Sequence, residues 1–275
     1  MRLVPIFLAL VLPALTGQAE PQRIVTAGAA VTEIACALGL GPRLVAVDTS
    51  SRHLEETRDK PDIGYVRTLG AEGILSQEPD LILISSEAGP PGVLEQLARS
   101  GVTMITVANG HELENIDDKI RIIAEATGRT SEAEAVIARV TEDIAALRQL
   151  VAAGDERPRV VFLLARHGGS LMAAGTETAA HAMIEAVGGV NAAGSFAGFR
   201  PLTPEFFATQ PPDFVLVSES VGENDAGLLE GLPGLGAGSA GQGPQIIRVD
   251  DAAFLGFGPR TPSAAAAVAT ALRRP

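Results

Sequence analysis

Two stretches of one pattern decide the fold: AEGILSQEPDLILI at residues 71–84 and PEFFATQPPDFVLV at residues 204–217. In both stretches Glu, Gln and a Pro-Asp pair stand at the same offsets, and an apolar run follows. A short helix that stops at proline and leads into a buried strand accounts for this pattern. Two copies of one unit predict two similar lobes, and a cleft between lobes is a common place for a ligand.

Strands alternate with helices on both sides of these stretches. The strand-like runs of the first half are 23–27, 44–47, 81–84 and 102–107. The alternation resumes with a strand at 159–164 and closes with a strand at 245–249 and a helix that begins at Thr261-Pro262. This order predicts an α/β protein with two Rossmann-like lobes, a parallel sheet in each, and a ligand cleft between them.

A long helix is expected between the two halves. Residues 131–153 contain neither Gly nor Pro and carry a stripe of apolar side chains. Ser131 and Glu134 form a candidate capping box at its start. We therefore divide the chain into an N-terminal lobe at 20–129, a connecting helix at 130–154 that bridges the lobes stiffly, and a C-terminal lobe at 155–275.

The first 19 residues have the character of a secretory signal peptide. Arg2 precedes an apolar run at 3–15, and small residues stand at positions −3 and −1 of a cleavage site after Ala19. The run is too short for a permanent membrane anchor. No cysteine stands at the cleavage site, so we expect a freely exported periplasmic protein rather than a lipoprotein. We also expect a monomer.

The composition excludes several classes of partner. The chain has 21 Lys and Arg against 33 Asp and Glu, a net charge of −12. So acidic a surface argues against nucleic acid and against anionic membranes. An anionic ligand would therefore need locally placed arginines. Cys36 is the only cysteine, which excludes an intrachain disulfide and fits a small buried residue.

The common enzyme signatures are absent from the sequence. There is no G-x-S-x-G elbow, no P-loop and no G-x-G-x-x-G turn. The four histidines lack the spacing of a zinc site, and we assign no role to His53, His111 or His181. The sequence therefore gives no support for an esterase, a P-loop enzyme or a dinucleotide-binding enzyme.

Tyr65 is the only tyrosine and lies in a polar loop before the first repeat. In an extended segment Tyr65 and Arg67 would project to the same side. Ferric iron favours a phenolate, a nearby guanidinium lowers the pKa of a phenol, and tyrosinate is an axial ligand of ferric heme in some proteins. A structural loop tyrosine with a satisfied hydroxyl fits the same sequence, so both interpretations stay open at this point.

Four further residues have both a functional and a structural interpretation. His167 follows the strand at 159–164, at the sheet edge where α/β proteins hold ligands, but loop histidines are commonly plain surface residues. Met172 would either contact a macrocycle or pack in the core. Glu72 and Glu205 begin the repeat helices, where a carboxylate stabilises the helix dipole by about 0.3–1 kcal/mol. Alternatively, they are a matched pair of docking carboxylates, one on each lobe.

Several motifs resemble the periplasmic binding proteins of bacterial heme ABC importers. That family belongs to a class that also holds vitamin B12 and ferric-siderophore binders. The resemblance covers nearly the whole mature chain. The motifs that carry it are GYVRTLGAEG at 64–73, AGPP at 88–91, MAAG at 172–175 and LGFGPRTP at 255–262.

The resemblance implies a role for each candidate residue. Tyr65 would be the axial ligand of the heme iron and Arg67 its neighbour, and His167 stands where some members add a second iron ligand. Glu72 and Glu205 match the carboxylates that members set against arginines of the permease. The implied cargo is heme, and the implied partners are an ABC permease and its ATPase in the inner membrane.

The heme propionates would need cationic neighbours, for which Arg67, Arg166 and Arg200 are candidates, with Met172 against the macrocycle. Release would be driven by the permease engaging both lobes. The alternatives are a carrier for another metal chelate, such as cobalamin or a ferric siderophore, or a periplasmic α/β enzyme.

Overall fold

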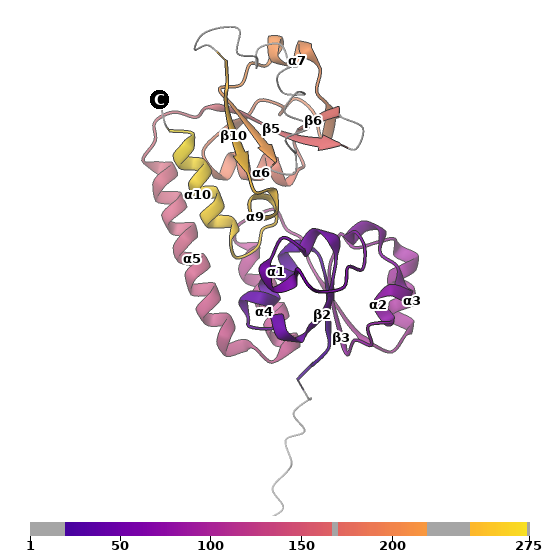
Figure 1. Ribbon diagram of the computed structural model, residues 1–275. Coiled ribbons are helices and arrows are strands. Elements are labelled where there is room, and N and C mark those ends of the chain that lie inside the picture. The colour runs from indigo at the N-terminus through magenta and orange to yellow at the C-terminus, as the bar shows by residue number, and fades with distance from the viewer. Residues whose placement is uncertain (1–19, 167–169, 219–242, 274–275) are drawn as a thin grey trace, which may run out of the picture.

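The computed structural model describes residues 20–166, 170–218 and 243–273. They form two α/β lobes, one above the other in Figure 1, with helix α5 (Thr130–Ala152) running along the side of both. The expected signal peptide at 1–19 lies outside the described residues. Within the described residues, no helix has the length and hydropathy needed to cross a membrane.

The sheet of the N-terminal lobe is wholly parallel, in the order β2-β1-β3-β4. Its strands are β1 (Ile24–Ala27), β2 (Leu44–Val47), β3 (Leu81–Ser85) and β4 (Thr103–Val107). Successive side chains point to opposite faces, so Leu83 enters one core cluster and Ile82 and Ile84 enter another. Both faces are covered, which explains why β3 reads as a continuous apolar run.

Helices α1 (Ala29–Ala37) and α4 (Asn115–Thr127) cover one face of this sheet. Helices α2 (Ala71–Leu75) and α3 (Pro91–Arg99) cover the other face. Short 3-10 turns fill the connections at Gly41–Arg43, Thr49–Ser51, Glu55–Thr57 and Val66–Thr68.

The sheet of the C-terminal lobe has the order β10-β9-β5-β6-β8, with β7 paired to β5. Its strands are β5 (Arg159–Arg166), β6 (Ser170–Ala174), β7 (Val190–Asn191), β8 (Phe199–Pro201), β9 (Phe214–Ser218) and β10 (Gln245–Val249). The α/β prediction with two lobes is confirmed, but this sheet is mixed, because β6 runs antiparallel to β5 and β8 antiparallel to β6. Only three residues join β5 to β6, too few for a parallel crossover.

Four helices accompany the second sheet in the described residues: α6 (Ala179–Ala186), α7 (Pro204–Thr209), α9 (Asp251–Leu255) and α10 (Thr261–Ala271). Two of them begin at side-chain caps. The hydroxyl of Thr178 accepts a hydrogen bond from the backbone of His181 at 3.1 Å. The carboxylate of Asp250 accepts one from Ala253, also at 3.1 Å. These caps fix where each helix starts beside the lobe junction.

A shared clamp explains the repeated sequence pattern. In the N-terminal lobe, the carboxylate of Asp80 accepts from the backbone N–H of Arg23 at 3.0 Å, and the Arg23 guanidinium donates to carbonyls of the turn before Asp80. In the C-terminal lobe, Asp213 accepts from the N–H of Arg159 at 2.7 Å, and the Arg159 side chain donates to Gln210 and to the carbonyl of Pro211. The Pro-Asp pair therefore ties the start of two parallel strands together in both lobes.

The predicted connecting helix is α5, which packs against α4 in one lobe and α10 in the other. Its 23 residues give a rod about 34 Å long at 1.5 Å per residue. The predicted capping box is wrong. The helix begins at Thr130 with Arg129, not Ser131, at its N-cap. The Ser131 hydroxyl bonds Glu132, and Arg121 of α4 pairs with the Glu134 carboxylate at 2.9 Å.

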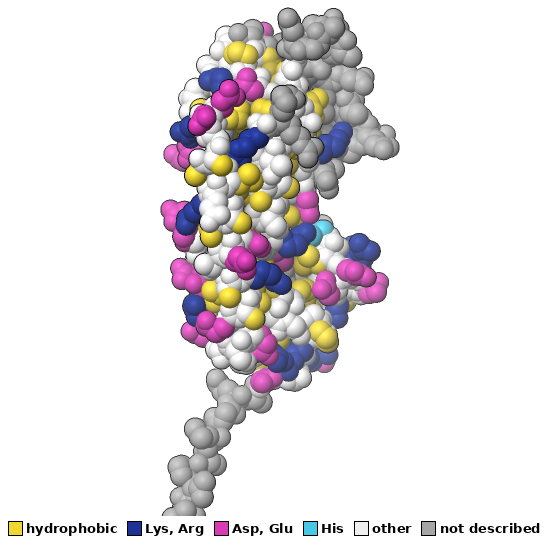
Figure 2. Space-filling view, turned by 90° about the vertical axis from the view of Figure 1, so that its left-hand side faces the viewer, with side chains coloured by type: hydrophobic (Ala, Val, Ile, Leu, Met, Phe, Trp, Pro, Cys, Tyr) yellow, Lys and Arg dark blue, Asp and Glu magenta, His cyan; other side chains and the backbone are white. Residues whose placement is uncertain are grey.

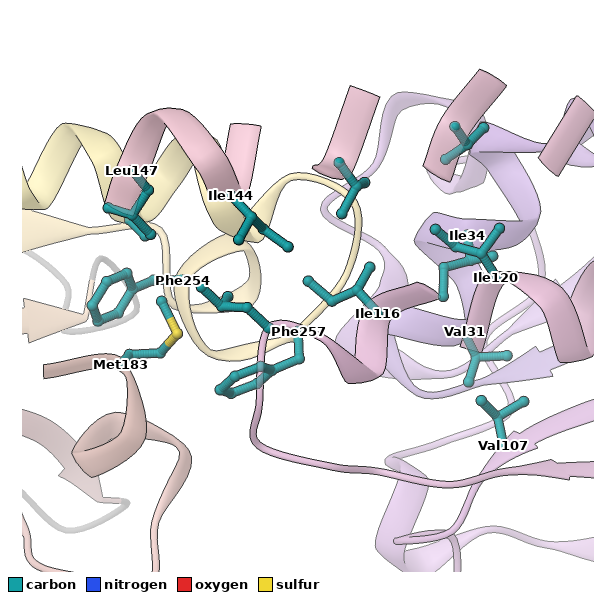
Figure 3. Close-up of a cluster of buried hydrophobic side chains, with 14 of the residues drawn as sticks. Val31, Ile34, Val107, Ile116, Ile120, Ile144, Leu147, Met183, Phe254 and Phe257 are labelled. Atoms are coloured by element: carbon teal, nitrogen blue, oxygen red, sulfur yellow. The ribbon is translucent and has the colours of Figure 1, made fainter. Parts of the chain in front are cut away.

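One hydrophobic cluster runs through both lobes (Figure 3). At the junction, Phe254 and Phe257 from the C-terminal lobe meet Ile144 of α5 and Ile116 of α4. Phe257 is fully buried, and burying a side chain of this size stabilises the fold by about 2–3 kcal/mol. A shared core of this kind, together with α5, opposes large movements of one lobe against the other.

Candidate ligand-binding cleft

A cavity of about 880 Å³ lies between the two lobes. Seen from the side, the outline of the molecule is notched where the lobes meet (Figure 2). The N-terminal lobe contributes residues at the carboxyl ends of β1, β3 and β4, which is the edge where parallel sheets hold ligands. The C-terminal lobe contributes 177–179, 198–199, 250–252 and 255–256. We call this cavity the cleft.

Tyr65 stands in the cleft wall directly before the 3-10 turn at Val66–Thr68. It is 49% exposed, and no described residue hydrogen-bonds its hydroxyl. The backbone around it is pinned, because Gly89 donates to the carbonyl of Val66 at 3.0 Å and accepts from Leu69 at 2.8 Å. Gly64 has φ +92°, a left-handed conformation that favours glycine at the turn before Tyr65.

Arg67 lies in the same wall, and its guanidinium donates to the carboxylate of Glu87. The other oxygen of Glu87 accepts from the side-chain amide of Asn109 at 2.7 Å. Asn109 accepts in turn from Lys119 at 3.4 Å. These contacts form a polar chain along the N-terminal wall of the cleft.

Lys119 is a buried cation, 3% exposed. Its ammonium also donates to the backbone carbonyl of Gly110 at 3.4 Å and to that of Phe257 at 3.2 Å. Burial lowers the pKa of Lys119 to about 8, and the charge of Glu87 opposes this shift. Lys119 therefore joins the polar chain of the N-terminal lobe to a carbonyl of the C-terminal lobe.

Phe257 enters the N-terminal lobe from the connection between α9 and α10. Its ring centroid lies 5.6 Å from that of His111 and 5.7 Å from the Nζ of Lys119. Its φ of 52° is uncommon for a bulky residue. His111 also lines a second cavity of about 710 Å³ between α5 and α6. Of the two cavities, the cleft is the one lined by the strand ends and by Tyr65.

A second tie between the lobes involves Glu33 of α1 and Arg260. The backbone N–H of Arg260 donates to Glu33 at 2.6 Å, and its Nε lies 3.2 Å from the other carboxylate oxygen. Burial raises the pKa of Glu33, and the bonds from Arg260 oppose this shift. Arg260 also donates to Asp250 at 3.2 Å and contacts the Nε2 of His53 at 2.8 Å.

The family model for periplasmic binding proteins matches residues 24–253. The chain belongs to the periplasmic binding protein family. Members of this family are binding proteins that work outside the cytoplasm.

The chain is similar to binding proteins for two different ligands, heme and cobalamin. The chain is similar to the structure of the periplasmic heme-binding protein RhuT from Roseiflexus sp. RS-1 in apo form, with a TM-score of 0.83 and 40% identity, covering 91% of this chain and 97% of that one. It is 27% identical over 219 residues to a cobalamin-binding protein of Halobacterium salinarum, covering 78% of this chain.

A third relative is an uncharacterized ABC transporter substrate-binding lipoprotein, YvrC, of Bacillus subtilis. It is 25% identical to the chain over 205 residues, or 74% of the chain. The chain spans 58–65% of the length of these two curated relatives, YvrC and the cobalamin-binding protein.

The predicted site residues of this family member fall in different places. Tyr65 and Arg67 line the cleft together. Met172 is buried in β6 and Arg200 stacks 4.9 Å above the ring of Phe196. Neither is among the described residues that line the cleft.

The remaining predicted residues are Arg166 and His167, which follow each other in the sequence, and Glu72 and Glu205, which stand in helices α2 and α7. Arg166 is the last residue of β5, and its side chain is not described. His167 lies outside the described residues. Glu72 and Glu205 are exposed in the first turns of α2 and α7. The backbone amide of Glu205 itself and the side chain of Thr203 lower the pKa of the Glu205 carboxyl.

The sequence interpretation missed Phe199, Glu87 and Lys119. Phe199 is 43% exposed and lines the cleft from the C-terminal lobe, opposite the lobe that carries Tyr65. Lys119 had a signal, because it falls on the apolar stripe of its helix beside Ile116 and Ile120. Among the described residues there is no group of three His, Cys, Asp or Glu side chains that could hold a metal ion directly.

Proposed function

We propose that the chain is the substrate-binding protein of an ABC importer, which captures heme in the cleft and delivers it to a permease in the inner membrane. The observation that carries the proposal is Tyr65: a half-exposed phenol with no hydrogen-bond partner in the described residues, in the wall of a cleft between two lobes. The 40% identity to the heme-binding protein RhuT supports heme as the ligand.

Tyr65 would bind the ferric iron as a phenolate. The side chain lines the cleft and its hydroxyl is not engaged by any described residue, so an incoming metal could reach its oxygen. Arg67 stands two residues away in the same wall. Its positive charge would favour both the phenolate and a propionate of the ligand.

The rest of the wall suits a flat, apolar molecule with anionic edges. Small apolar residues at 29–31 and 107–108 line the N-terminal side. Phe199 offers an aromatic face from the C-terminal side. Apolar walls with a few placed polar groups are typical of small-molecule sites.

His167 remains a proposed second iron ligand from the C-terminal lobe, with Arg166 and Arg200 as proposed propionate partners and Met172 as a proposed contact of the macrocycle. Neither Arg200 nor Met172 is among the described residues that line the cleft, although Phe199, which precedes Arg200, does line it. A spectrum of hemin-loaded His167→Ala that differs from wild type would support ligation by His167.

Glu72 and Glu205 would dock the permease. They are exposed, and each begins a helix in a different lobe. Engagement of both by permease arginines would place force across the lobe junction, and the ATPase of the importer would drive release. We further propose a periplasmic monomer, exported through the leader at 1–19 and without catalytic activity.

Titration of the purified protein with hemin, with cobalamin as competitor, tests the function. We expect saturable hemin binding that cobalamin does not displace. The cobalamin-binding relative of Halobacterium salinarum makes cobalamin the second candidate. Displacement of hemin by a stoichiometric amount of cobalamin would favour that candidate instead.

A further inference from the structure

The ion pair between Arg67 and Glu87 has a consequence for ligand affinity. We propose that Glu87 is a built-in counterion of the ligand site, which an anionic ligand must displace from Arg67. The inference rests on the proposed function, in which a ligand with carboxylates enters the cleft. Glu87 would then weaken the binding of a ligand that carries free carboxylates. In this way Glu87 would set the affinity of the cleft for that ligand.

Arg67 is free to change partners. Its side chain is 59% exposed, and Glu87 is the one described residue with which its guanidinium forms a hydrogen bond or ion pair. Both residues line the cleft. A carboxylate of a ligand that approaches Tyr65 would therefore meet a guanidinium already engaged by a protein carboxylate.

Glu87, by contrast, is fixed in place. Its second oxygen accepts from Asn109 at 2.7 Å, and its backbone N–H donates to the hydroxyl of Ser85 at 3.2 Å. The amide of Asn109 has a defined orientation, because its oxygen must accept from the ammonium of Lys119 at 3.4 Å. Glu87 therefore keeps a donor and a nearby cation when Arg67 turns away.

A carboxylate of a ligand can displace Glu87 from Arg67. An exposed ion pair of this type is worth little, and its loss changes an equilibrium by about fivefold at most. Removal of the Glu87 charge should therefore tighten the binding of an anionic ligand by a factor of roughly three to five. A ligand without carboxylates should gain nothing from the change.

Two forms of one ligand test the inference: hemin, and hemin dimethyl ester, in which both carboxylates are capped. We expect Glu87→Gln to lower the Kd for hemin by about three- to fivefold and to leave the Kd for the ester unchanged. In an Arg67→Ala background, the same substitution should have a much smaller effect on hemin. Glu134→Gln is the matched control. Glu134 forms an ion pair with Arg121 at an N–O distance of 2.9 Å, and neither residue lines the cleft.

Weaker hemin binding by Glu87→Gln, or an equal gain for hemin and its ester, would overturn the inference while leaving the proposed function intact. An equal gain in Glu134→Gln would also overturn it, because the effect would then come from net charge alone. No binding of hemin by the wild-type protein would overturn the proposed function and this inference with it.

Discussion

The ammonium of Lys119 in the N-terminal lobe donates to the backbone carbonyl of Phe257 in the C-terminal lobe at 3.2 Å. The ammonium also faces the ring of the same residue at 5.7 Å. A buried cation therefore links the ligand wall of one lobe to a residue inserted from the other. The polar chain from Arg67 ends at this link.

The first prediction concerns the pH dependence of stability. Burial lowers the pKa of Lys119 from 10.5 to about 8, so the unfolded chain binds more protons than the folded protein between these values. Stability from this group should therefore rise with pH from about 8 to 10.5. The free energy of unfolding of the wild type, minus that of Lys119→Met, should increase by roughly 3 kcal/mol across the window. Urea unfolding at several pH values measures it, and a constant difference would contradict the shift.

The second prediction concerns the tie between Glu33 and Arg260. Arg260→Met removes the guanidinium from a buried carboxylate, which should destabilise the fold by about 1–3 kcal/mol in urea unfolding at neutral pH. The double variant with Glu33→Gln no longer buries a carboxylate that has lost its guanidinium partner, so it should recover part of the loss. A double variant less stable than Arg260→Met would show that the carboxylate does not need this partner.

The third prediction concerns Phe199. Phe199→Ala should weaken hemin binding by about 5- to 150-fold, because burial of an aromatic face against a ligand contributes about 1–3 kcal/mol. The thermal midpoint should change little, because the side chain is 43% exposed. Ile246→Ala is the control: Ile246 is similarly exposed, at 44%, but does not line the cleft. Equal effects of the two substitutions on affinity would remove Phe199 from the site.

The sequence predicted what depends on local pattern. The repeated Pro-Asp turn and the apolar run after it predicted a buried strand in each lobe, and the structure adds that Asp80 and Asp213 clamp the neighbouring strand. The same pattern could not reveal that the second sheet is mixed. That feature follows from the three-residue connection between β5 and β6, and the strand at 170–174 has no strong signal of its own.

The candidate site was predictable in part for a related reason. Tyr65 and Arg67 are close in sequence, so one loop carries both to the cleft. Glu87, Lys119 and Phe199 come together only through the tertiary fold. The contact of Lys119 with Phe257 joins residues 138 positions apart. No spacing rule in a single sequence reaches that far.

Ligation of the heme iron by Tyr65 is tested by the absorption spectrum of the hemin-loaded protein with and without the hydroxyl of Tyr65. Tyr65→Phe keeps the ring and removes a group that has no hydrogen-bond partner among the described residues, so the thermal midpoint of the ligand-free protein should stay the same. We expect a ferric-tyrosinate spectrum for the wild type and its loss in Tyr65→Phe, with much weaker binding of hemin. An unchanged spectrum and affinity in Tyr65→Phe would contradict the assignment of Tyr65 as the iron ligand.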